Sequence, residues 1–106
     1  MGSERRSSER KRILRDAKWE SMSHTHEVRV DDVSLGGCFV NTYGRVELGE
    51  QVELQIQLPS GQWLPLRGHV ASYQPGVGFG VSFDKLSQKE TASLKELITT
   101  SKERKL

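Results

Sequence analysis

The sequence predicts an all-β domain with a terminal helix: a small antiparallel barrel of six strands followed by one C-terminal α-helix. Short segments in which apolar and polar residues alternate recur along the chain, and glycine and proline separate them. Only the last segment changes to a helical period. The length of 106 residues, of which 34% are hydrophobic, suits one domain with a small core. These features are typical of a small barrel with a helix packed on it.

Six segments are expected to form the strands, at residues 13–21, 26–30, 36–43, 51–58, 63–74 and 79–84. The fourth, "QVELQIQL", alternates most clearly, with Val52, Leu54, Ile56 and Leu58 on one face. In the fifth, Pro65 indicates an edge or a bulge, because proline cannot donate a hydrogen bond to a neighbouring strand. The turn "PSGQ" joins these two strands into a hairpin.

A helix is expected after the last strand. Ser87 and Glu90 form an S-x-x-E capping box, and Leu94, Leu97 and Ile98 share one helical face. We therefore expect one domain over residues 1–106, consisting of an arginine-rich arm at 1–12, the barrel at 13–85 and the helix at 86–104.

The charge is distributed unevenly along the chain. Residues 1–18 carry seven basic residues against three acidic ones, whereas the rest of the chain carries nine against eleven. The stretch "ERRSSERKR" at 4–12 alone holds five of the 16 basic residues. A basic arm on a near-neutral domain is typical of proteins that bind phosphates or an acidic surface, and a solvated tail is the alternative. Ordering such an arm costs about 1–2 kcal/mol per residue, which a ligand could offset.

The catalytic motifs sought in the sequence are absent, so we predict that this protein is not an enzyme. It contains no G-x-S-x-G, H-E-x-x-H or C-x-x-C. His24 and His26 form an H-x-H without a third ligand nearby, and we expect two exposed loop histidines rather than a metal site. Asp31 and Asp32 would point to opposite faces of a strand, which argues against a carboxylate dyad. Cys38 has no evident base beside it.

The composition predicts a cytoplasmic protein. No apolar run approaches the roughly 18–20 residues that a membrane span requires. The first residues are basic and polar, which differs from the apolar segment of a secretory signal. A single cysteine, which cannot form an internal disulfide, fits a reducing compartment.

The stretch "DDVSLGG" at 31–37 has two interpretations. As a ligand site, Asp32 could accept hydrogen bonds from the N1–H and N2–H edge of guanine, and Ser34 could donate to a phosphate oxygen. Both would project from one face if the segment is extended. Gly36 and Gly37 would permit positive φ and give a ligand access to backbone N–H groups. The alternative is a plain turn, Asx-type at Asp32, that binds nothing.

The arginines of the arm have the spacing that the first interpretation needs. Arg6 and Arg10 form an R-x-x-x-R pattern with Arg5 directly before it. A guanidinium grips phosphate through two parallel hydrogen bonds, bonds the O6 and N7 edge of guanine, and stacks on bases. The arm alone would also suit a nucleic acid. However, the sequence shows no aromatic-rich RNA-binding pattern, and the slightly acidic remainder would repel a long polyanion.

Together, these motifs resemble the PilZ domain family. The chain has Arg6-Ser7-Ser8-Glu9-Arg10, then about twenty residues later Asp32-Val33-Ser34-Leu35-Gly36-Gly37, which fits D-x-S-x-x-G. The later stretch "LRGHVASYQPGVGFGVSF" is similar to the closing strands of that family, which end in G-V-x-F.

The resemblance implies a PilZ-type barrel that acts as a bacterial receptor for cyclic di-GMP, with no further cofactor and an effector protein as its partner. In this chain it assigns Arg6 and Arg10 as principal ligands, and Asp32, Ser34 and Gly37 as the opposite side of the clamp. An arginine before the first motif arginine, here Arg5, accompanies binding of an intercalated ligand pair in this family. Two ligands per chain are therefore implied.

One departure from the family pattern concerns the aromatic residues. Some ligand-binding members carry a tryptophan in the closing strands, where this chain offers only Tyr73. Trp19 and Trp63 lie on other strands, and we expect them to be core or rim residues. Two other functions stay open at this point: a protein-interaction adaptor without a ligand, and a nucleic-acid-binding barrel.

Overall fold

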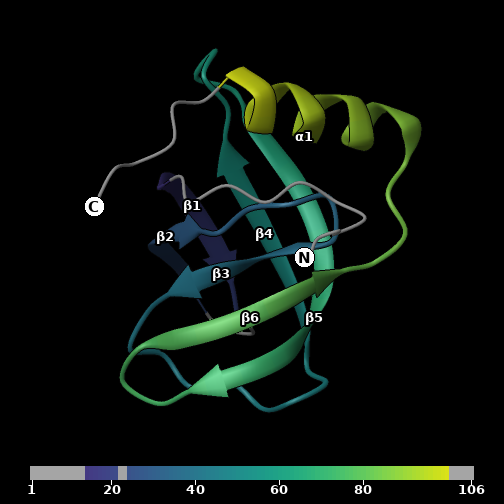
Figure 1. Cartoon of the computed structure of the whole chain (residues 1–106). Coiled ribbons are helices and arrows are strands. Elements are labelled where there is room, and N and C mark those ends of the chain that lie inside the picture. The colour runs from purple at the N-terminus through teal and green to yellow at the C-terminus, as the bar shows by residue number, and fades with distance from the viewer. Residues whose placement is uncertain (1–13, 22–23, 101–106) are drawn as a thin grey trace, which may run out of the picture.

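Six antiparallel strands close into a barrel in the order β1-β2-β3-β6-β5-β4, and one helix lies across an end of it (Figure 1). The computed structural model describes residues 14–21 and 24–100. The elements are β1 (Arg15–Glu20), β2 (Thr25–Asp31), β3 (Gly37–Asn41), β4 (Gln51–Gln57), β5 (Trp63–Gln74), β6 (Gly78–Phe83) and α1 (Gln88–Thr100). The predicted fold class, an antiparallel barrel with a terminal helix, is confirmed.

The inward-facing side chains of the six strands fill the barrel and form the core. In β4, Val52, Leu54 and Ile56 are buried and alternate with exposed or half-buried polar residues, as the sequence predicted. Trp19 from β1 packs edge-on against Phe79 from β6, with 5.1 Å between the ring centroids. Burying each large apolar side chain contributes roughly 1.5–3 kcal/mol, so this inward face holds the strands together.

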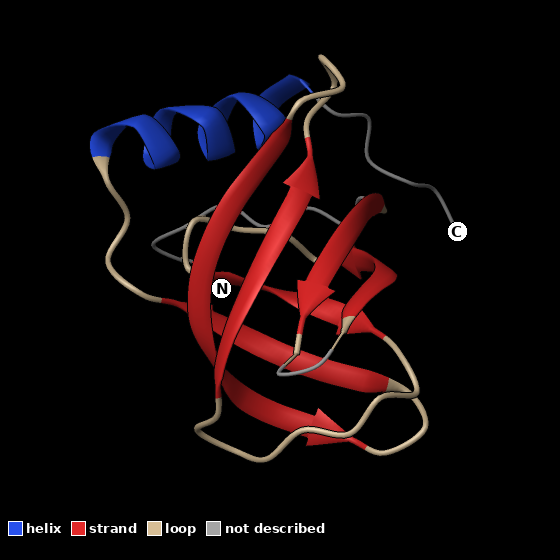
Figure 2. Cartoon of the chain, turned by 180° about the vertical axis from the view of Figure 1, so that it is seen from behind, coloured by secondary structure: helices blue, strands red, loops and turns tan. Residues whose placement is uncertain are grey.

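β5 is the longest strand and extends from beside α1 to the far end of the barrel (Figure 2). Its first half pairs with β4 alone, and its register with β6 begins at Gly68. The backbone carbonyl of Arg67 accepts a hydrogen bond from the backbone N–H of Asp84, on the side of β5 away from β4. The backbone nitrogen of Pro65, two residues earlier, faces the same side of β5 as the Arg67 carbonyl. At this position β6 does not pair with β5. The edge position predicted for this proline is thus confirmed.

The capping box of the helix is also confirmed. The Ser87 hydroxyl accepts from the Glu90 N–H at 3.0 Å, and the Glu90 carboxylate accepts from the Ser87 N–H at 2.9 Å. This reciprocal pair makes Ser87 the N-cap, so α1 begins at Gln88 rather than at 86. Leu94, Leu97 and Ile98 are buried against the barrel. The expected helix end at 104 lies outside the described residues. Among the described helical residues, no segment is long and apolar enough to cross a membrane.

Candidate functional site

The segment between β2 and β3 is a turn. Asp32 has a φ of 55°, in the left-handed region that aspartate tolerates better than most residues. Its N–H donates to the Asp31 carboxylate at 2.6 Å. The segment is therefore not extended, so the condition under which Asp32 and Ser34 would project from one strand face is not met. The chain leaves the strand geometry at Asp32, so the period of two no longer applies there.

Ser34 holds this turn closed. Its side chain is buried, and its Oγ accepts from the Gly36 N–H at 3.1 Å and donates to the Gly37 carbonyl at 3.4 Å. Its own N–H donates to the same carbonyl at 2.9 Å. A hydroxyl bonding the N–H two residues ahead is a serine turn, which stabilises a local reversal of the chain. In the described conformation, the Ser34 proton is therefore directed to the protein backbone.

The two glycines have different roles, and neither adopts the positive φ that glycine permits. A Cβ at Gly37 would overlap the carbonyl oxygen of Val81, since β3 and β6 lie close together at this point. A Cβ at Gly36 would meet only the Ser34 Oγ, at an ordinary 3.8 Å. Gly37 is thus needed for close strand packing, whereas position 36 has room for a side chain.

The turn borders a hollow of about 460 Å³ on the outer face of the barrel. Four predicted site residues meet here: Asp32, Ser34, Gly36 and Gly37. The floor comes from β3, β6 and β5, and a β-bulge between Val70 and Ser72 interrupts the β5–β6 register at its side. The remaining lining residues, which were not among the predicted site residues, are Cys38, Phe39, Ala71, Ser72, Gln74, Gly80, Val81 and Ser82.

The predicted arginines Arg5, Arg6 and Arg10 lie outside the described residues. Within the described lining of the hollow, Asp32 is the one charged side chain, and it is negative. The remaining side chains of that lining are small, apolar or uncharged polar groups. Any phosphate held here would therefore need cations from a different part of the chain.

Cys38 faces the core below this hollow. Burial raises the pKa of its thiol to about 12, and the negative charge of Asp32 adds to the shift. A thiol with this pKa is protonated at neutral pH and is a poor nucleophile.

We expect Cys38 to resist thiol reagents while the protein is folded. At pH 8 only about one thiol in 10⁴ would be ionised at that pKa, and the sulfur is buried. Reaction with Ellman's reagent should be slow in buffer and complete within the mixing time in concentrated urea. Fast, stoichiometric reaction in buffer would contradict this prediction.

The histidines differ in part from the expectation of two loop residues. β2 begins at Thr25, so His26 lies in a strand, where its ring stacks on Trp19 with centroids 4.5 Å apart. The Ser21 hydroxyl is 3.1 Å from its Nε2. His24 precedes the strand and is exposed. In the parts of the chain that the structure describes, no three potential metal ligands gather.

The tryptophans occupy the places predicted for them. Trp19 is part of the core, at 3% exposure. Trp63 is half-buried on the barrel surface, where the Lys18 ammonium lies 4.5 Å from its ring centroid. Tyr73 packs against the core and borders a separate hollow with Arg45 and Pro75.

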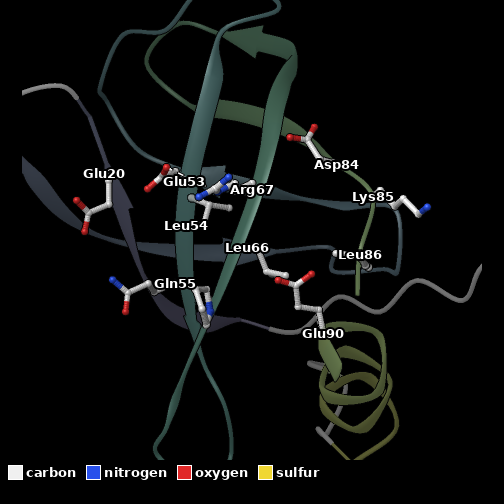
Figure 3. A pocket seen from close by; sticks show the side chains of 11 residues that line it. Glu20, Glu53, Leu54, Gln55, Leu66, Arg67, Asp84, Lys85, Leu86 and Glu90 are labelled. Carbon is white, nitrogen blue, oxygen red and sulfur yellow. Dashed lines mark ion pairs between the residues drawn. The ribbon is translucent and has the colours of Figure 1, made fainter. Parts of the chain in front are cut away.

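A larger hollow of about 570 Å³ lies between β4, β5 and the segment leading into α1 (Figure 3). Its charged lining residues are Glu20, Glu53, Asp84 and Glu90 against Arg67 and Lys85. Arg67 is 3.8 Å from Glu53, and Asp84 accepts from Gln51 at 2.7 Å. The charged residues of this larger hollow sum to −2, against −1 for the hollow beside the turn, so the larger hollow repels an anionic nucleotide more strongly.

Comparisons with known proteins identify the sequence pattern of the PilZ domain over residues 4–100. Among solved structures, the chain is similar to the Bacillus subtilis inhibitor of motility MotI/DgrA, with 17% identity and a TM-score of 0.73. That likeness covers 92% of this chain but 51% of the inhibitor, so the chain spans about half of its length. The PilZ domain of CeSA from a cellulose-synthesizing bacterium matches at 17% identity and a TM-score of 0.66, covering 86% of this chain and 95% of that domain. No curated protein matches.

Proposed function

Because this chain belongs to the PilZ domain family, we propose that it is a receptor for cyclic di-GMP, a ligand class that this family binds. In the proposed complex, Arg6 and Arg10 grip phosphates and guanine edges. The turn at Asp32–Gly37 bounds the other side of the ligand. The protein binds and signals rather than catalysing a reaction.

The charge of the hollow beside the turn is the observation that carries this proposal. This hollow has the volume of a small-molecule site. Its described lining includes one charged group, the Asp32 carboxylate. A carboxylate complements the N1–H and N2–H edge of guanine, but it repels phosphate. The missing positive charge has a source in the same chain, since the family pattern covers Arg5, Arg6 and Arg10 as well as the turn.

Signalling would follow from the way the two motifs share the ligand. A ligand held by both motifs brings arginines of the arm against the outer face of β3, β6 and β5, and so changes the charge of that face. A partner protein that binds one charge state better than the other would respond to the ligand. We infer an effector protein as this partner.

Isothermal titration calorimetry with cyclic di-GMP tests the function. We expect saturable heat of binding, and the absence of both heat and NMR shifts at tens of micromolar ligand would refute it. Binding of oligonucleotides with a steep salt dependence, without response to cyclic di-GMP, would favour the nucleic-acid-binding barrel. Partner binding that survives deletion of residues 1–12 and ignores the ligand would favour the adaptor.

The same titration gives the stoichiometry. If Arg5 stacks on a guanine of an intercalated pair, the wild type binds two ligands per chain and Arg5→Ala binds fewer. The charge-matched control is Arg45→Ala, an exposed residue that does not line the hollow beside the turn. A two-to-one complex that persists in Arg5→Ala would remove the role assigned to Arg5.

A further inference from the structure

Phe39 is an aromatic side chain that the hydrophobic core does not use. Its neighbours in β3, Cys38 and Val40, are buried inside the barrel, so strand alternation turns Phe39 to the outer face. It is half-buried there and lies outside the hydrophobic cluster that fills the barrel. Among the described residues that line the hollow beside the turn, it is the one aromatic.

On the β2 side, Asp31 is directly opposite Phe39, but towards β6 and β5 the outer face carries almost no side-chain bulk. Phe39 is directly opposite Gly80 in the β3–β6 register, and Gly80 is opposite Ser72 of β5. A Cβ at Gly78 would come within 2.7 Å of the Phe39 Cε2, so the ring lies over this glycine. The outer face here is therefore a shelf of glycine and serine beside one aromatic ring.

We propose that Phe39 is the platform on which a guanine ring of the ligand stacks. This rests on the proposed function, since it names a contact for the same ligand. Asp32, which lines the same hollow, can hold only the edge of a guanine, because a carboxylate offers acceptors and no flat surface. An aromatic ring can cover the face, and stacking is favourable for every base. Tyr73 cannot take this role, because it packs against the core and borders a different hollow.

A purely structural role is the alternative that the test must separate. An aromatic side chain lying over glycines also stabilises a sheet. Phe39→Leu keeps an apolar cover over Gly78 and Gly80 but removes the ring, and Phe39→Trp enlarges the ring. Tyr43→Leu is the matched control, since this aromatic is 88% exposed and does not line the hollow beside the turn.

We expect Phe39→Leu to bind cyclic di-GMP about five- to tenfold more weakly, while Tyr43→Leu binds as the wild type does. The H8 resonance of the stacked guanine should shift upfield in the wild type, through the ring current, and return toward its free position in Phe39→Leu. Phe39→Trp should retain binding. The fluorescence of the added tryptophan should be quenched by the ligand, and the wild type, which has two tryptophans, provides the reference signal.

The outcomes separate the two proposals. If the wild type binds and Phe39→Leu has unchanged affinity and an unchanged H8 shift, the stacking role is wrong and the receptor function stands. If the wild type does not bind, the proposed function fails and the stacking role fails with it. Should Phe39→Leu unfold at the assay temperature, Phe39→Trp decides alone, and a tryptophan unaffected by bound ligand overturns the stacking role.

Discussion

Replacing Arg6 or Arg10 by alanine is expected to weaken cyclic di-GMP binding about tenfold or more in each case. A hydrogen bond to a charged group contributes roughly 1.5–3 kcal/mol, and the hollow beside the turn offers no cation among its described lining residues. Arg10→Lys should fall between alanine and the wild type, because it keeps the charge but loses the planar fork that binds phosphate through two hydrogen bonds. Titration calorimetry measures all three variants.

The control for this series is again Arg45→Ala, which removes one positive charge without touching the proposed clamp. Its affinity should stay within about twofold of the wild type, because exposed charges at a distance are screened by salt. An equal loss in Arg6→Ala, Arg10→Ala and Arg45→Ala would mean that net charge alone governs binding. That result would contradict the assigned roles of Arg6 and Arg10.

Gly37→Ala is expected to destabilise the barrel strongly. The added methyl would overlap the Val81 carbonyl oxygen, which belongs to the backbone of β6 and cannot rotate away. Overpacking of this kind costs about 1–3 kcal/mol, and here we expect about 2 kcal/mol or more. For a domain of this size, the melting temperature should fall by about 8–16 °C. Urea unfolding and thermal melts measure the change.

Gly36→Ala is the matched control one residue earlier. Its methyl would have only a van der Waals neighbour at 3.8 Å, so the free energy of unfolding should stay within about 0.5 kcal/mol of the wild type. Equal destabilisation by the two substitutions would show that the turn, rather than the close approach of β3 and β6, is the reason that a side chain is not tolerated at position 37.

The barrel could be predicted because its strands bury one face. Alternation in β4 and β6 identifies the inward residues without knowledge of their partners, and the capping box likewise needs only four consecutive residues. β2 was predicted one residue short at each end because most of its outward positions are polar. Its extent depends on pairing with β1, where His26 is opposite Trp19.

The site was only partly predictable, because its geometry depends on contacts between distant strands. Local chemistry identified Asp32 and Ser34 but not the left-handed backbone at Asp32 or the closed serine turn. The need for glycine at 37 comes from Val81, 44 positions later, which no local pattern indicates. The outward direction of Phe39 was predictable, because its two neighbours in the strand face inward.

The buried, protonated thiol of Cys38 has a practical consequence for spectroscopy. Because the native cysteine should not react in the folded protein, a probe can be attached to an introduced cysteine without first removing it. Ser8→Cys in the arm and Val77→Cys, at a position 52% exposed at the tip of the β5–β6 turn, provide two such attachment points. A pair of spin labels at these positions would report the distance between the arm and the barrel, and its distribution with and without cyclic di-GMP would follow the proposed clamp directly.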